Sequence, residues 1–146
     1  MRNPLVLDTN VVLDLFVFAD KAALPLKELL DAGEVQWLAT PPMRVELERV
    51  LEYPHIVGKL AFYGVESAAV LESFDHHARL VEVAAKAPVT CKDGDDQKFI
   101  DLALEHGCPL LSKDAAVLSL KKRLAVLGVT VEKALTQAAF AAKPSA

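Results

Sequence analysis

Short apolar runs alternate along the chain with longer segments whose apolar residues recur at helical spacing. An apolar run of about four to eight residues bounded by turn residues is typical of a buried strand. The runs of this kind are residues 4–8, 35–39, 109–112 and, around Gly128, 125–131. Because strands that alternate with helices favour parallel pairing, the pattern predicts an α/β fold with a mainly parallel sheet.

Helix boundaries are indicated by capping residues and prolines. Asn10 can cap a helix that begins at Val11. Thr40, Pro41 and Pro42 open a second helix, which should end near residue 53 because a proline follows. Further helices are predicted at residues 24–32, 65–80, 95–106 and 115–123, with a polar loop at 91–95.

The composition fits one ordinary domain. The 146 residues are 53% apolar and 25% charged, with a formal net charge of −4, which excludes a disordered chain and a uniformly basic nucleic-acid coat. We expect a single domain over residues 1–137 and a flexible tail over residues 138–146. Cys91 and Cys108 are expected to be plain buried or half-buried thiols. Together with the lack of a visible secretory signal or membrane span, they predict a cytoplasmic location.

The acidic residues at the start of segment 95–106 face different ways. Counted from Asp96, Phe99 and Ile100 lie at i+3 and i+4, so Asp96 shares the apolar face of the helix. Asp95 is rotated about 100° away from that face. Asp96 could be a helix-start acid satisfied by free N–H groups, or a carboxylate held over the edge of the sheet.

Three other acids occupy comparable positions. Asp8 ends one predicted strand, Asp114 follows another, and Glu46 lies at the margin of an apolar helix face. Taken alone, each could be a turn residue, a cap or a boundary glutamate. Together with Asp96 they can meet at the carboxyl edge of the sheet, where α/β folds bind ligands. Carboxylates that meet in one place repel unless a cation neutralises them, and oxygen ligands favour Mg²⁺ or Mn²⁺ over zinc.

Four segments, in order, resemble the acidic motifs of the PIN-domain ribonucleases. They are Leu7-Asp8-Thr9-Asn10-Val11-Val12, Glu46-Leu47 followed by Arg49-Val50-Leu51, residues 93–99 leading to Ala103-Leu104, and Leu111-Ser112-Lys113-Asp114. The match covers nearly the whole chain. The double acid Asp95-Asp96 with Phe99 behind it looks most like the toxin branch of the family, whose members belong to toxin–antitoxin systems.

The resemblance implies a three-layer sandwich of helices around a central, mainly parallel sheet. It also implies Mg²⁺- or Mn²⁺-dependent cleavage of RNA phosphodiester bonds by a metal-activated water. Carried over by position, the residues that would bind the metal and act in catalysis are Asp8, Glu46, Asp96 and Asp114. The supporting polar positions are Thr9, Asn10 and Ser112, and Asp95 could share or replace the role of Asp96.

Partners follow from the same resemblance. A toxin of this kind would bind a small antitoxin protein and form a homodimer. Arg44, Lys98 and Lys113 are basic residues that could contact the backbone of an RNA substrate. The chain has no glycine-rich phosphate-binding motif, so we expect no nucleotide cofactor.

Two other functions fit part of the pattern. A phosphatase of the aspartyl-phosphate type could use Asp8 as its nucleophile, but such enzymes usually carry a second acid two residues on, where this chain has Asn10. A non-catalytic module that binds protein or RNA could retain the fold with a silent site. The complete set of four acids argues against that module.

Overall fold

The computed structural model describes residues 3–134. Five strands form one sheet in the order β3-β2-β1-β4-β5, and every neighbouring pair is parallel. The strands are β1 (Asn3–Leu7), β2 (Val35–Ala39), β3 (Ala78–Leu80), β4 (Leu110–Leu111) and β5 (Val131–Glu132). The predicted α/β fold with a parallel sheet is confirmed.

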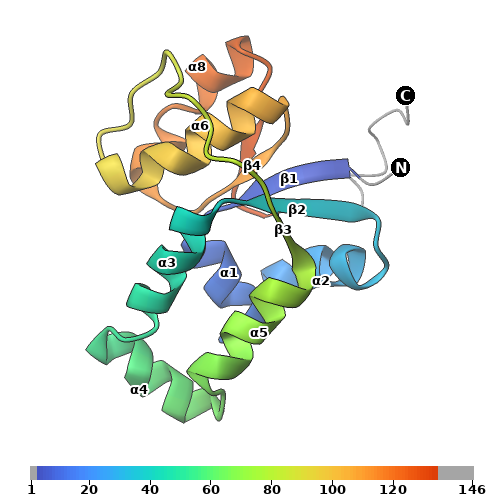
Figure 1. Ribbon diagram of the computed structural model, residues 1–146, viewed down its shortest axis with the longest axis vertical. Coiled ribbons are helices and arrows are strands. Elements are labelled where there is room, and N and C mark those ends of the chain that lie inside the picture. Colours follow the sequence, from blue (N-terminus) through green and yellow to red (C-terminus); the bar gives the residue numbers. More distant parts are fainter. Residues whose placement is uncertain (1–2, 135–146) are drawn as a thin grey trace.

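Helices cover both faces of this sheet (Figure 1). One layer contains α6 (Gln97–His106) and α8 (Lys121–Val126), and the other contains α1 (Thr9–Phe16), α2 (Leu24–Asp31), α3 (Pro41–Val50) and α5 (Ser67–His77). The remaining elements are α4 (Pro54–Tyr63), at the far end of the second layer, the short α7 (Ala115–Leu118), and the 3₁₀ turns η1 (Lys21–Ala23) and η2 (Gly94–Asp96). None of the helices in the described part has the length and apolar character that crossing a membrane requires.

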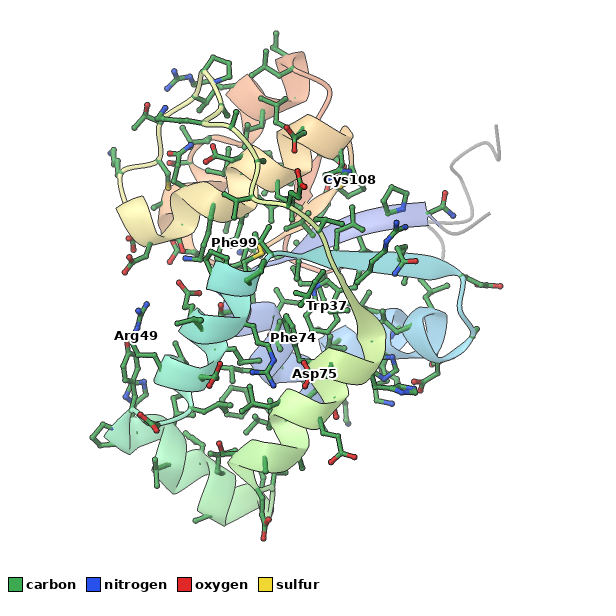
Figure 2. All side chains as sticks on the ribbon, viewed as in Figure 1. Trp37, Arg49, Phe74, Asp75, Phe99 and Cys108 are labelled. Atoms are coloured by element: carbon green, nitrogen blue, oxygen red, sulfur yellow. The ribbon has the colours of Figure 1, made fainter. Side chains whose placement is uncertain are left out.

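The core lies where the central strands meet the two helix layers. Trp37 of β2 packs edge-on against Phe74 of α5, with 4.9 Å between the ring centroids (Figure 2). Phe99 and Ile100 of α6 are fully buried in the other layer, and burial of each such side chain contributes about 1.5–3 kcal/mol. This packing fixes the start of α6, and therefore the acids that precede it, against the sheet.

One helix start and one helix end differ from the sequence prediction, and one further helix was not predicted. Asp8 rather than Asn10 occupies the cap position, and α1 begins at Thr9, because the chain turns into the helix directly after β1. The helix predicted to run to residue 53 ends at Val50. Pro54 then begins α4, which the prediction missed, since proline suits the first turn of a helix as well as its end.

Segments near the sheet edges also differ. The helix predicted over residues 65–80 ends at His77, and its last three residues form the edge strand β3, whose mostly exposed side chains give little hydrophobic signal. The helix predicted at 115–123 is divided into α7 and α8. Most of the strand predicted at 125–131 is helix end and turn, with Gly128 at φ 89°, so that β5 begins only at Val131. The predicted tail, 138–146, lies outside the described residues, and the predicted domain limits stay a prediction.

Candidate metal centre

A row of buried polar residues lies across the carboxyl edge of the three central strands. The register of β1 with β4 brings Asp8 level with Ser112, and the register of β1 with β2 brings Asp8 level with Thr40. All three residues are buried, and the Thr40 hydroxyl has no hydrogen-bond partner within residues 3–134. This is the edge at which parallel α/β sheets bind ligands.

Asp8 is held in place by the end of β4. The Ser112 hydroxyl donates a 2.6 Å hydrogen bond to Asp8 Oδ2 and accepts the backbone N–H of Asp114 at 3.1 Å. Burial raises the pKa of Asp8, the hydrogen bonds from Ser112 and from the backbone of Thr9 lower it, and the charges of Glu46 and Asp114 raise it again. The raised pKa indicates that the surrounding groups do not fully compensate the negative charge of Asp8.

Three further aspartates converge beside the end of β1. One carboxylate oxygen from each of Asp93, Asp96 and Asp114 lies within 4.8 Å of the others. Asp93 and Asp96 stand at the two ends of the turn before α6, and Asp114 is the cap residue of α7. Asp93 Oδ1 accepts the backbone N–H of Asp95 at 3.0 Å, and Asp114 Oδ1 accepts that of Ala116 at 2.8 Å. Each of these two aspartates therefore has one carboxylate oxygen engaged in a hydrogen bond to a backbone N–H of its own turn.

Among the three aspartates of this group, Asp96 has the most strongly raised pKa. It is 7% exposed, and its buried Oδ2 atom has no hydrogen-bond partner among the residues that the structure describes. Burial raises the pKa of Asp96 to about 8, with further contributions from the charges of Asp8, Asp114 and Asp93 and from the contact with Asp114. A buried carboxylate oxygen that has no donor and lies among other carboxylates is suited to a divalent cation, so the donor set fits a metal ion.

Glu46 lies close to this group but has partners of its own. The Thr9 hydroxyl donates to Glu46 Oε2. The Lys98 ammonium donates a 2.6 Å hydrogen bond to Oε1, and Arg49 Nη2 lies 4.0 Å from the same oxygen. The charge of Glu46 still raises the pKa of Asp8, which places the two carboxylates within electrostatic reach. Glu46 is thus a buried acid whose negative charge is compensated by the ammonium group of Lys98.

The sequence matches the PIN domain over residues 4–116. The chain belongs to the PIN-domain family. Proteins of this family are generally metal-dependent nucleases, and the cluster of Asp93, Asp96 and Asp114 gives this PIN domain a group of acids that such chemistry requires. A comparison with curated proteins finds no match.

The acids that the sequence singled out lie near one another in this PIN domain. The charges of Asp8 and Asp114 act on Asp96, and those of Glu46 and Asp114 act on Asp8. Asp95 is exposed, whereas its neighbour Asp96 is buried. Sequence reasoning missed Asp93 as part of the group. Its spacing of three residues from Asp96 was the available signal, because positions i and i+3 of a helical turn lie on one side.

The supporting and basic residues are distributed around this centre. Asn10 Oδ1 accepts the backbone N–H of Lys113 at a long 3.4 Å, and the Lys113 ammonium lies 2.5 Å from Asp14. Arg44 is bound to α5, where its Nε atom donates to Asp75 at 2.7 Å (Asp75 is labelled in Figure 2). Among the three cations expected to contact RNA, Lys98 is therefore the one whose charge is tied directly to an acid of the predicted site.

Proposed function

We propose that this PIN domain is a Mg²⁺- or Mn²⁺-dependent endoribonuclease. The observation that carries the proposal is the buried Oδ2 atom of Asp96, which lacks a hydrogen-bond partner in the described part of the chain and belongs to a group of three carboxylates. Asp93, Asp96 and Asp114 would hold the ion, with Asp8 beside them. Oxygen ligands of this kind are preferred by Mg²⁺ and Mn²⁺.

When bound, a divalent ion would supply a Lewis acid for the phosphodiester and an activated water. The residues of the chain then have separate tasks. Ser112 orients Asp8 through its 2.6 Å hydrogen bond and links it to the loop that carries Asp114. Lys98 and Thr9 hold the two oxygens of Glu46, and the Lys98 ammonium adds a positive charge where a phosphate group would approach.

We propose RNA as the substrate and a role as the toxin of a toxin–antitoxin pair. The support is the order of the four acidic segments and the Asp95-Asp96 pair followed by Phe99. In this proposal Lys98, Lys113 and Arg44 contact the RNA backbone, the chain forms a homodimer, and a small antitoxin protein binds it. Expression of the chain should arrest growth of a host cell, and co-expression of a short neighbouring open reading frame should relieve that arrest.

The direct test of the nuclease proposal uses the purified full chain and a labelled single-stranded RNA. Cleavage is expected with Mg²⁺ or Mn²⁺ and should stop in excess chelator, because the acid group needs a cation to neutralise it. The Asp8→Asn variant serves as the inactive control for a contaminating ribonuclease. Undiminished cleavage in chelator, or equal cleavage by Asp8→Asn, would contradict the proposal.

A further inference from the structure

The loop that delivers Asp93 to the acid group has no regular secondary structure. It occupies residues 81–93, between β3 and the turn before α6. Ala87, Val89 and Cys91 are each 5% exposed, while Pro88 and Thr90 between them are exposed, so this stretch buries every second side chain as a strand does. Val81 at the start of the loop donates to the carbonyl oxygen of Ala39 of β2 at 2.8 Å, but the backbone of residues 87–91 forms no ladder with any of the five strands. Other groups must therefore satisfy its buried N–H and C=O groups.

Two side chains of α6 supply these hydrogen bonds. Gln97 Oε1 accepts the backbone N–H of Cys91 at 2.7 Å, and Gln97 Nε2 donates to the carbonyl oxygen of Val89 at 2.9 Å. Asp101, one turn later, accepts the backbone N–H of Ala87 at 2.8 Å through Oδ1. The same Oδ1 atom accepts Gln97 Nε2 at 2.8 Å, which joins the two side chains into one anchor.

This anchor is adjacent to the acid group at both of its ends. Asp96 is the cap residue of α6 and Gln97 is its first residue, so the start of this helix carries one acid and also binds the loop that ends in the other acid, Asp93. Cys91, the last residue gripped, lies two positions before Asp93. The position of the Asp93 carboxylate relative to that of Asp96 therefore depends on their shared turn, where the Asp96 N–H donates to the Asp93 carbonyl oxygen at 3.1 Å, and on how the loop before this turn is held against α6.

We infer that Gln97 and Asp101 are positioning residues, which fix Asp93 relative to Asp96 for binding of a divalent cation. The inference rests on the proposed function only in taking Asp93, Asp96 and Asp114 as the ligands. Neither side chain needs to touch the ion or the RNA. Removing a residue that holds a metal ligand in place without touching the ion typically lowers metal affinity or activity by about 10–100-fold.

The test is a titration of the metal-free full chain with Mn²⁺. Electron paramagnetic resonance measures the concentration of free Mn²⁺ at each step and so gives the Kd. Gln97→Met keeps the length of the side chain and removes its three hydrogen bonds, so the Kd for Mn²⁺ should rise about tenfold or more. Asp101→Asn keeps the Oδ1 acceptor and should bind Mn²⁺ as the wild type does, whereas Asp101→Leu should show the same loss as Gln97→Met.

Lys86→Met is the matched control within the same loop. Lys86 donates to the carbonyl oxygen of Ala87 at 2.9 Å and to the Thr90 hydroxyl at 2.8 Å, but both bonds stay inside the loop and do not reach α6. Its loss should leave the affinity for Mn²⁺ unchanged. An equal loss in Lys86→Met would show that general loosening of the loop, and not the anchor on α6, sets the affinity, and this would overturn the inference.

A second measurement needs no variant. In the wild type, the amide hydrogens of Ala87 and Cys91 should exchange slowly with solvent despite the irregular loop, because each donates to a side chain of α6. Fast exchange of both, or wild-type Mn²⁺ affinity in Gln97→Met, would overturn the inference. A wild type that binds Mn²⁺ but leaves RNA intact would instead contradict the proposed nuclease and leave the anchor standing.

Discussion

The Ser112 hydroxyl donates a 2.6 Å hydrogen bond to Asp8 Oδ2 across 104 positions of the sequence. The bond joins the carboxyl ends of β1 and β4, and Ser112 also accepts the N–H of Asp114. One fully buried hydroxyl therefore ties together two of the acids that the sequence predicts for the site.

Ser112→Ala should weaken Mg²⁺ or Mn²⁺ binding and RNA cleavage by about 10–100-fold without unfolding the chain. The physical reason is that the hydrogen bond from Ser112 lowers the pKa of Asp8, so its loss disfavours the ionised carboxylate that a cation needs. The measurement is Mn²⁺ affinity together with circular dichroism. Ser119→Ala is the control, because its hydroxyl is bonded only to the carbonyl oxygen of Ala116 on the exposed side of α7.

Asp8→Asn should abolish cleavage, by about 10²–10³-fold, while the metal-free protein stays folded and becomes no less stable. Burial and the neighbouring acids raise the pKa of Asp8, which means that its charge opposes folding at neutral pH. Thermal unfolding in chelator compares the two proteins. Unfolding of Asp8→Asn at room temperature would show that Asp8 is needed for the fold itself, and its assignment to the site would be wrong.

The metal-free protein should lose stability as the pH rises from about 4 to about 8. The pKa of Asp96 is raised from 3.8 to about 8, so between these values the folded state holds a proton that the unfolded state has released. Stability falls with pH wherever the folded state binds more protons, by at most about 1.4 kcal/mol per pH unit for one group.

Asp96→Asn removes this titration. The difference in unfolding free energy between Asp96→Asn and the wild type should therefore grow in favour of the variant over the same pH window in chelator. Denaturant unfolding at pH 4, 6 and 8 measures that difference. A difference that is independent of pH would contradict the raised pKa of Asp96.

Mg²⁺ should raise the melting temperature of the wild type, because a ligand that binds only the folded state stabilises it by mass action. At about 100 times the Kd the gain is about 2.7 kcal/mol, which is several degrees for a domain of this size. The Asp8→Asn, Asp96→Asn double variant should show no such shift. An equal shift in both proteins would place the ion elsewhere on the acidic surface.

The pattern of apolar runs predicted the central sheet well because β1, β2 and β4 are buried on both faces. Their buried residues are all apolar, and the polar exceptions are the exposed Asn3 at the start of β1 and the half-buried Gln36 in β2. The edge strand β3 escaped detection because it is short, contains Arg79 and is largely exposed. The helix α4 escaped prediction because Pro54 suits the end of one helix as well as the first turn of the next.

The candidate site was predictable in part. The positions of Asp8 and Asp114 could be predicted because each follows the end of a buried strand. The burial of Asp96 could be predicted from the helical angle that it shares with the buried Phe99 and Ile100. The angle argument holds although the first turn is a 3₁₀ turn. Asp93 was missed although its spacing of three residues from Asp96 was a signal, since its position also depends on an irregular loop that Gln97 and Asp101 hold from α6.

The measurement that tests the account most directly separates two neighbouring aspartates. Single-turnover cleavage of a labelled single-stranded RNA at fixed Mn²⁺ is compared for Asp96→Asn and Asp95→Asn, with circular dichroism to confirm that both are folded. Asp96→Asn removes a buried carboxylate of the acid group and should lose about 10²–10³-fold in rate. Asp95→Asn changes an exposed side chain and should lose about tenfold or less. A folded Asp96→Asn variant that cleaves at the wild-type rate, or an inactive Asp95→Asn beside an active Asp96→Asn, would contradict the account.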